Sequence, residues 1–267
     1  MQWLMSVSKF VDPYELKARL FPGLLVLAPA IIFLGLTYGP KAPIVAALGT
    51  IATSCGGPYA LANFVRSLGQ SAQERLFERW GASPSTMLLR HRDRRLPKPT
   101  KLKYHRLIEY KLGVGMPTEE QELANPEEAD QAYAAAADAL RPMTNDAKKF
   151  PFIFKELVAY GFNRNSYGAK WVALLVCLIA GCAVLIHEKI LFWRRPYYDL
   201  SALNGMSVAG SITLIIAAVL GLAWMLHFRE KIVEQAGYSY ALRLWEALEK
   251  IPKKADKSQL TKPAPPR

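Results

Sequence analysis

The chain has 267 residues, of which 51% are hydrophobic and only 21% are charged, and its formal net charge is +12. Asp, Glu, Lys and Arg are absent from four stretches, 20–40, 42–65, 171–186 and 200–228. A helix needs about 20 apolar residues to cross a hydrocarbon core of about 30 Å, so each stretch, with its flanks, can form a membrane span. The composition excludes an ordinary soluble enzyme, a disordered chain and a small disulfide-rich domain.

These stretches predict an all-α, polytopic membrane protein, in which two transmembrane hairpins, that is four spanning helices, flank a helical cytosolic domain. The predicted segments, in chain order, are an N-terminal interfacial helix (1–19), the first hairpin (20–62), the cytosolic domain (63–169), the second hairpin (170–228), an amphipathic helix (229–251) and a disordered basic tail (252–267).

The distribution of basic residues predicts the orientation of the chain. Lys and Arg are retained on the cytoplasmic side of a membrane. Of the 34 Lys and Arg residues, 30 lie before the first span, between the two hairpins or after the last span. We therefore expect both termini and the central domain in the cytoplasm, where basic side chains can meet anionic lipid headgroups.

The first hairpin is rich in residues that interrupt helices. Asp12 and Pro13 form a favoured N-cap and first-turn pair, so a helix is expected to begin there and to run into the membrane. Pro29 is expected to kink or unwind the first span. The run from Cys55 to Pro58 is expected to break the second span. Enrichment of Pro and Gly in membrane helices explains these residues more simply than a gating hinge does.

The cytosolic domain carries helical signals, and alternating patterns typical of strands are absent. Thr118 and Gln121 match a capping box, and Asn125 precedes an Ala-rich helix that ends before Pro142. A last helix is expected from about Asp146 to Tyr160. The predicted helices run over about 68–80, 102–112, 126–141 and 146–160.

Positive charge is concentrated in one part of this domain. Between Arg66 and Arg106 there are 11 basic and three acidic residues, a net charge of +8. Arginine forks suit bidentate contact with phosphate or carboxylate oxygens. The residues that we select as candidate ligand-binding residues are Arg90, His91, Arg92, Arg94, Arg95, Lys101, Lys103, Tyr104 and His105.

Three interpretations of this basic segment stay open. It can lie against anionic lipid next to the membrane, to which each basic residue contributes about 1 kcal/mol, and this interpretation has the most weight. It can recognise a nucleotide, a nucleic acid or another phosphorylated ligand. It can also pair within the chain with the acidic helix from Glu119 to Asp138.

A second local signal comes just before Lys170 opens the third span. Gly161 is expected to end the preceding helix, and the polar residues after it are expected to form a turn at the headgroup level. This turn is either a plain interfacial turn or the place where movement of the cytosolic domain reaches the membrane. The candidate coupling residues are Tyr160, Gly161, Phe162, Arg164 and Asn165.

After the last span, apolar residues recur at steps of three and four from Ile232 to Ile251, which predicts an amphipathic helix. Its apolar face must be covered by the cytosolic domain, by a partner or by lipid headgroups. Packing against the cytosolic domain is the preferred interpretation.

Signatures of catalysis and of metal or cofactor binding were not found. His187 and Glu188 are not followed by a second His at the metalloprotease spacing, and no phosphate-binding loop is present. Cys55, Cys177 and Cys182 lie in apolar stretches without metal-ligand spacing. We expect no catalytic residue, metal or cofactor.

Five short stretches of the central domain and of the entry to the third span form a recognisable pattern. They are Leu88-Leu89-Arg90-His91-Arg92-Asp93, Thr100-Lys101 with Tyr104-His105, Ala129-Asp130 with Tyr133, Leu140-Arg141 with Thr144 and Asp146, and Tyr160-Gly161-Phe162 with Arg164-Asn165. In these stretches the chain resembles a group of uncharacterised bacterial membrane proteins. In outline it is also similar to membrane effectors of bacterial anti-phage systems, in which a cytosolic sensing module is joined to membrane helices. The resemblance implies a multi-pass protein of the bacterial inner (cytoplasmic) membrane.

Three hypotheses follow for function. The first is a non-enzymatic, homo-oligomeric membrane effector or channel-like protein whose basic cytosolic domain senses an anionic ligand, such as a phosphorylated small molecule, or a protein; nucleic acid is less favoured. The second is a scaffold or accessory subunit of a larger complex, whose segment from Arg229 to Ile251 docks a partner. The third is an enzyme that acts on a phosphate-containing substrate through Arg90, His91, Asp93, Tyr104 and His105.

Overall fold

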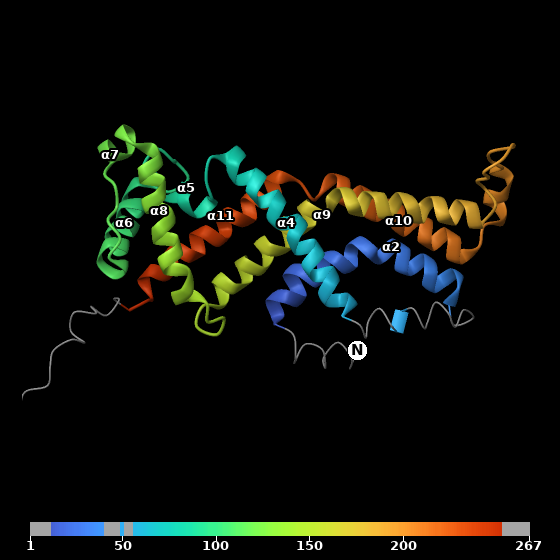
Figure 1. Cartoon of the computed structure of the whole chain (residues 1–267), viewed down its shortest axis with the longest axis horizontal. Coiled ribbons are helices and arrows are strands. Elements are labelled where there is room, and N and C mark those ends of the chain that lie inside the picture. The colour runs from blue at the N-terminus through green and yellow to red at the C-terminus, as the bar shows by residue number, and fades with distance from the viewer. Residues whose placement is uncertain (1–11, 40–48, 51–55, 253–267) are drawn as a thin grey trace, which may run out of the picture. The chain divides into compact units, whose positions relative to one another are not determined.

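A computed structural model of the chain describes residues 12–39, 49–50 and 56–252 (Figure 1). These residues are mainly helical, and their one extended pairing is an isolated bridge between Leu191 and Tyr198. The elements in chain order are η1 (Glu15–Leu20), α2 (Phe21–Thr37), α4 (Gly57–Trp80), α5 (Pro84–Leu89), α6 (Lys98–Leu112), α7 (Glu119–Ala124), α8 (Pro126–Leu140), η3 (Arg141–Thr144), α9 (Pro151–His187), η4 (Leu200–Gly205), α10 (Val208–Leu226), α11 (Glu230–Glu246) and η5 (Ala247–Glu249).

The described residues form two compact units. The first unit contains the residues up to Leu76 together with Val158–Val233. The second unit contains Phe77–Leu157 together with the residues from Glu234 onward. The expected all-α fold is confirmed for this part of the chain.

Three helical segments are long and apolar enough to cross a membrane: Glu15–Thr37, Pro151–His187 and Val208–Leu226. The structure thus shows three candidate spans where the sequence predicted four. The predicted span that ends at Ala62 falls largely on 40–48 and 51–55, outside the described residues. Gly56 has a φ of +80° and α4 begins at the next residue, so a helix does start at the predicted Gly-Pro break.

The helix of the N-terminal candidate span begins as predicted, but its departure from α-helical geometry lies before Pro22 and not at Pro29. Asp12 caps it, because its Oδ1 accepts from the N–H of Tyr14 at 2.9 Å. The helix continues through Pro29, where a kink was expected, and the departure from α geometry is the π-helical turn η1, just before Pro22. A π-helical turn shifts the hydrogen-bond register by one residue, which suits a following proline that has no N–H.

The expected helix end at Gly161 is wrong. Helix α9 runs without interruption for 37 residues from Pro151 to His187, which at 1.5 Å per residue is about 55 Å. The predicted cytosolic helix, the predicted turn and the third span are therefore one element. Gly161 has an ordinary helical φ, and the close approach of Ala18 and Tyr14 is what leaves no room for a side chain there.

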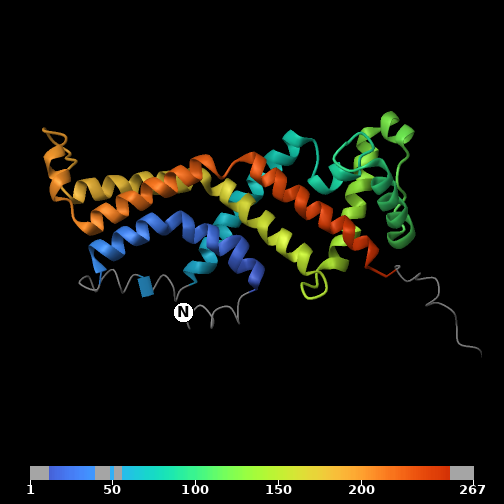
Figure 2. The same ribbon diagram turned by 180° about the vertical axis from the view of Figure 1, so that it is seen from behind.

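In the first unit, α2 packs against α10, and Figures 1 and 2 both show the two helices side by side. The small core of this unit is aromatic and aliphatic. Trp224 and Phe228, with ring centroids 4.4 Å apart, pack with apolar residues of the other helices. The buried members of this core are Val26, Val65, Ala169, Ala173, Cys177, Trp224 and Phe228.

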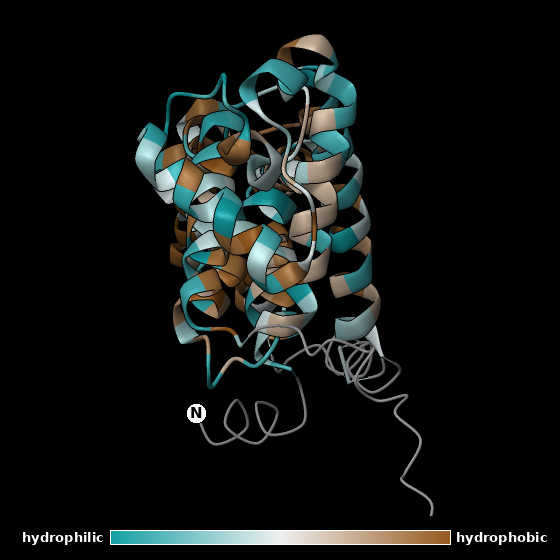
Figure 3. Cartoon of the chain, turned by 90° about the vertical axis from the view of Figure 1, so that its left-hand side faces the viewer, coloured by the Kyte–Doolittle hydropathy of each residue, from teal (hydrophilic) through white to brown (hydrophobic). Residues whose placement is uncertain are grey.

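The second unit has a larger core, formed by α5, α6, α8, α11 and η5. Thr118 and Gln121 form the predicted capping box of α7, and Asn125 caps α8. Figure 3 shows hydrophilic and hydrophobic residues alternating around its helices, as expected for amphipathic helices around one core. The fully buried members with large side chains are Leu89, Ile108, Tyr133, Leu140, Leu244, Trp245 and Leu248.

The apolar face of α11 belongs to this core, so the preferred interpretation of that helix is confirmed. Leu244 and Trp245 are 0% exposed, and Trp245 Nε1 donates to the carbonyl oxygen of Ser85 at 3.1 Å. The face that the scaffold hypothesis offered to a partner is therefore already covered. A protein partner would have to displace the core of the second unit to reach it.

Candidate functional site

The predicted ligand-binding residues surround the segment from Arg90 to Asp93, which connects α5 to α6. Lys101 holds this segment from inside: its Nζ donates to the carbonyl oxygens of Arg90 at 2.5 Å, His91 at 3.3 Å and Asp93 at 2.5 Å. An ammonium group has three N–H donors, so these bonds use all of them. Lys101 is 2% exposed, and burial lowers its pKa. Lys101 therefore positions the segment and does not face a ligand.

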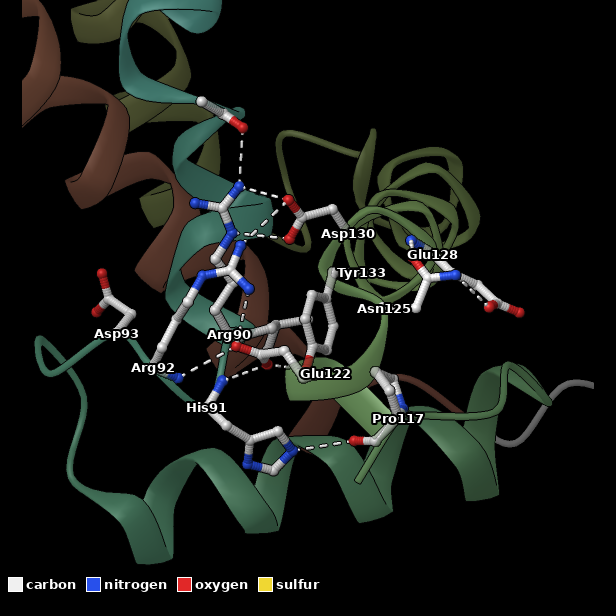
Figure 4. Close-up of polar contacts among 12 residues, drawn as sticks. Arg90, His91, Arg92, Asp93, Pro117, Glu122, Asn125, Glu128, Asp130 and Tyr133 are labelled. Atoms are coloured by element: carbon white, nitrogen blue, oxygen red, sulfur yellow. Dashed lines mark hydrogen bonds and ion pairs between the residues drawn. The ribbon is translucent and has the colours of Figure 1, made fainter. Parts of the chain in front are cut away.

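Glu122 is the polar centre of this part of the unit (Figure 4). It is 2% exposed, and its carboxylate accepts from the N–H of His91 at 2.7 Å, the N–H of Arg92 at 3.2 Å, Arg92 Nη1 at 3.2 Å and the Tyr133 hydroxyl at 2.7 Å. Burial alone would raise the pKa of Glu122, but these donors, Tyr133 first, hold it below its usual value. Glu122 is thus a buried carboxylate that stays ionised because four donors solvate it.

Arg90 makes a bidentate ion pair with Asp130 of α8, as Figure 4 shows. The Nε–Oδ1 distance is 2.7 Å and the Nη2–Oδ2 distance is 2.6 Å, and Nη2 also donates to the carbonyl oxygen of Gly81 at 2.8 Å. Fork-to-fork geometry of this kind is strong and directional. Arg92 reaches the same Asp130 oxygen more loosely, at 3.5 Å. The interpretation of the basic run as pairing within the chain therefore describes Arg90 and Arg92.

The two histidines of the segment are engaged with backbone carbonyls. His91 Nε2 lies 2.9 Å from the carbonyl oxygen of Pro117, and His105 Nε2 lies 2.8 Å from that of Leu89. A carbonyl only accepts, so both imidazoles carry a proton on Nε2. Burial lowers the pKa of His105. Their rings meet edge to face at 4.8 Å, and within the described ranges no group of three His, Cys, Asp or Glu residues could hold a metal ion.

Arg95 links the segment to α11. Its Nη1 pairs with Asp93 at 2.7 Å and its Nη2 with Glu234 at 3.0 Å, and the guanidinium lies 4.1 Å from the ring centroid of Tyr238. Beside it is a cavity of about 330 Å³. The residues that line this cavity, called here the arginine cavity, are Trp80, Met87, Arg90, Arg92, Asp93, Arg95, Glu234 and Tyr238.

The structure divides the predicted ligand-binding residues into groups. Arg90, Arg92 and Arg95 line the arginine cavity. His91, Lys101 and His105 are held by backbone and buried contacts, and Tyr104 lines a different cavity. Lys103 pairs with Glu249 at 2.6 Å, and Arg94 is exposed on the surface outside the cavity lining.

Sequence reasoning missed Trp80, Glu234 and Tyr238. Trp80 is at the end of a predicted helix, and Glu234 and Tyr238 lie about 140 residues after Arg95. Their position on α11 offered one signal, because a helix whose apolar face packs on the basic domain must bring its flanking polar residues close to that domain. Which basic residue they meet depends on the packing angle.

The candidate coupling residues gather in the first unit, where α9 crosses α4 and η1. Gln73 Oε1 accepts from the Tyr160 hydroxyl at 3.0 Å and from Arg164 Nη1 at 2.9 Å. Asn165 Oδ1 accepts from Arg164 Nε at 3.1 Å and Nη2 at 3.0 Å. The guanidinium of Arg164 is buried among these neutral acceptors, and the described residues offer it no ion pair. Phe162 packs against the core of the same unit.

Close helix contact produces this cluster. A Cβ atom on Gly69 of α4 would lie 2.0 Å from Asn165 Oδ1, and a Cβ on Gly168 of α9 would lie 2.4 Å from the carbonyl oxygen of Leu68. The two glycines therefore let the backbones of α4 and α9 approach each other. Small residues at helix contacts serve this purpose in membrane proteins.

Comparison of the chain with protein-family models, with curated proteins and with solved structures finds no match. Its function is therefore inferred from the chemistry and placement of its own residues.

Proposed function

We propose that the chain is a non-enzymatic, multi-pass protein of the bacterial inner membrane that responds to a small phosphate-bearing ligand. The second unit binds this ligand in the arginine cavity, and the spanning helices respond to binding by opening a pathway across the membrane. In this proposal the protein acts as a homo-oligomeric, channel-like effector of anti-phage defence. The observation that carries the proposal is the convergence of Arg90, Arg92 and Arg95 on one cavity. Guanidinium groups match phosphate oxygens in a bidentate manner.

The three arginines have different roles in this proposal. Arg90 is held on both sides by Asp130 and Gly81 and supplies a fixed positive potential. Arg92 and Arg95 are more available, with side chains 42% and 49% exposed. The bonds of Arg92 to carboxylates, at 3.2 and 3.5 Å, are long enough for a phosphate to compete with them. The aromatic rings of Trp80 and Tyr238 supply the apolar part of the lining.

The size of the cavity supports a small ligand. About 330 Å³ lies at the lower end of the range for small-molecule pockets, about 300 to 1,000 Å³. Two carboxylates, Asp93 and Glu234, share the lining, so a phosphate has to displace at least one of them from Arg95. The ligand thereby exchanges an internal ion pair for a new one, which is a basis for a switch.

Glu234 gives such an exchange a route toward the membrane helices. It lies in the N-terminal part of α11, and only three residues, from His227 to Arg229, separate α11 from the span α10. A phosphate that binds Arg95 releases Glu234 and so changes the contacts of a helix that directly follows a span. The scaffold alternative has no comparable support, because the apolar face of α11 is buried.

The test is ligand binding to the full-length protein in nanodiscs of neutral lipid. The probes are ATP, AMP and inorganic phosphate, measured by isothermal titration calorimetry. Arg95→Ala is expected to weaken binding at least tenfold, because a charge-assisted hydrogen bond contributes about 1.5–3 kcal/mol. The matched control is Arg106→Ala, which removes an exposed arginine of α6 outside the cavity.

Equal affinity in the Arg95→Ala variant, or no binding of any probe, would overturn the ligand site. If the protein binds none of these probes but binds vesicles that contain anionic lipid, the basic segment instead contacts lipid headgroups. For the response of the spans, the same proteins in dye-loaded liposomes are expected to leak when the bound probe is added. The absence of leakage with an intact binding isotherm would remove the channel-like effector and leave the binding site.

A further inference from the structure

The second unit contains another cavity, of about 440 Å³, which shares no lining residue with the arginine cavity. It is bounded by the first turn of α9, by Tyr104 of α6 and by the C-terminal end of α11 with η5. We call it the α9 cavity. Its lining residues are Tyr104, Lys149, Phe150, Pro151, Phe152, Ile153, Arg243, Glu246, Ala247, Glu249 and Lys250.

The N-terminus of α9, like that of α6, has no side-chain cap, whereas three other helices of this unit do. Ser83, Thr118 and Asn125 accept backbone N–H groups at the starts of α5, α7 and α8. The residue before α9 is Phe150, whose side chain has no acceptor. In the described part of the chain, the N–H groups of Phe152 and Ile153 meet no acceptor. These donors, at the positive end of a 37-residue helix, line the cavity.

Tyr104 is a second and independent sign of a ligand. It is 4% exposed, yet its hydroxyl forms no hydrogen bond with any residue that the structure describes. Burial, together with the charges of Glu246 and Glu249, raises the pKa of Tyr104, so the hydroxyl keeps its proton. A largely buried tyrosine whose hydroxyl has no acceptor among the described residues therefore borders the same cavity as the donors of α9.

The charges of the lining leave an excess of positive groups. Glu246 is paired with Arg243 at 2.6 Å, and Glu249 with Lys103 at 2.6 Å. Lys149 reaches Asp146 only at 3.7 Å. The Lys250 ammonium has no ion pair among the described residues. Both lining carboxylates are thus paired with a cation, while the Lys250 ammonium and the N–H groups of Phe152 and Ile153 are not paired among the described residues. The donors and cations that remain suit an anion with several acceptor oxygens.

We infer that the α9 cavity binds a phosphate group, held by the N–H groups of Phe152 and Ile153, the Tyr104 hydroxyl and the Lys250 ammonium. Phosphate fits better than a halide because its oxygens can accept from several donors at once. The apolar lining by Phe150 and Pro151 admits the carbon body of a phosphate ester. This site is separate from the arginine cavity and does not depend on the function proposed for that cavity.

The experiment uses the full-length protein with Arg95→Ala as background, so that the arginine cavity does not contribute. The probe is inorganic phosphate, titrated in nanodiscs of neutral lipid and followed by ³¹P NMR line broadening. Two variants are added separately. Tyr104→Phe removes one hydroxyl and keeps the ring, and Lys250→Gln removes one exposed charge.

We expect Lys250→Gln to weaken phosphate binding about tenfold and Tyr104→Phe about threefold to tenfold, from the usual values of charged and neutral hydrogen bonds. The matched controls are Tyr110→Phe, an exposed tyrosine on the same helix, and Lys148→Gln, an exposed lysine outside the lining. Both controls are expected to bind phosphate as the background protein does. Thermal unfolding without phosphate checks that each variant is folded.

Unchanged phosphate affinity in folded Lys250→Gln and Tyr104→Phe proteins would overturn the inference, as would the lack of phosphate binding by the background protein. A second arm distinguishes the source of the phosphate. Soluble glycerol phosphate competing with inorganic phosphate indicates a free phosphate ester. Competition only by nanodiscs with phosphatidylglycerol indicates a lipid headgroup on the same donors.

Discussion

The side-chain amide of Asn165 donates to the carbonyl oxygen of Ala18 at 2.6 Å, and the residue four positions after Ala18 is Pro22. Proline has no N–H, so Pro22 cannot donate to the Ala18 carbonyl as the fourth residue of an α-helix would. Ala18 lies in the π-helical turn η1, and Asn165 of α9 gives its carbonyl a side-chain donor there. A proline in one helix and an asparagine in another, 143 positions apart in sequence, are thereby matched to each other.

The first prediction tests this match by a double-mutant cycle. Asn165→Ala is expected to destabilise the protein by about 1–2 kcal/mol, because it leaves the Ala18 carbonyl and the Arg164 guanidinium short of partners. Pro22→Ala adds a backbone N–H that can serve the Ala18 carbonyl once the π-helical turn takes α geometry, so the cost of Asn165→Ala is expected to be smaller in that background. Unfolding of the four proteins in detergent with increasing SDS measures the coupling. Strict additivity would contradict the assignment of Asn165 as the acceptor's partner.

The second prediction concerns the contact between α4 and α9. Gly69→Ala is expected to destabilise the protein by about 2–3 kcal/mol, since the new methyl group would overlap Asn165, including its Cα at 2.9 Å. Gly35→Ala in α2 is the matched control, because no atom outside its own helix turn lies within 4 Å of the place that its methyl group would occupy. That change is expected to be neutral or slightly stabilising. Equal melting temperatures for the two variants would show that α4 and α9 are not in close contact.

The third prediction follows from Glu122. Its pKa in the folded state is lowered, so its contribution to stability is present above the pKa of an unfolded Glu, about 4.3, and is lost as the pH falls through the folded value. Glu122→Gln is expected to cost about 3 kcal/mol at pH 7 by breaking a buried charged network. Below a pH of about 4.3, the stability of the Glu122→Gln variant should also depend less on pH than the stability of the wild-type protein does. Chemical unfolding at several pH values measures both effects, and parallel profiles would contradict the role of Glu122.

The fourth prediction concerns His105, whose folded pKa is lowered by burial. Between that value and about 6.5 the unfolded chain binds a proton that the folded protein does not, so stability rises with pH in this window. His105→Gln is expected to flatten this slope while it keeps a donor for the carbonyl of Leu89. Stability measured from about pH 5 to about pH 7 in both proteins provides the check. A slope that survives in His105→Gln belongs to another group.

Several features could be predicted from the sequence because they depend on neighbouring residues. Three of the four predicted apolar stretches coincide with the candidate spans of the structure, since the length of a span is set by the bilayer. The capping box of Thr118 and Gln121 and the cap of α8 at Asn125 formed as expected, because a cap is a contact over three residues. The chemical type of the candidate site, guanidinium groups near one another, was also visible.

Other features were decided by the tertiary structure. Gly161 has the appearance of a helix end, but α9 continues through it because Ala18 and Tyr14 pack against a position without a side chain. Only the packing of α8 against α5 makes Arg90 a partner of Asp130. Arg95 meets Glu234 only because α11 packs on the core of the second unit.

The sequence by itself thus determined where membrane helices, caps and charges lie, because these depend on hydropathy, on turn chemistry and on residue type over short distances. The tertiary structure decided which charges are neutralised, which side chains line a cavity and which donors remain unsatisfied. Those properties depend on contacts between residues such as Arg95 and Glu234, which are 139 positions apart. No local pattern encodes the distance between such residues.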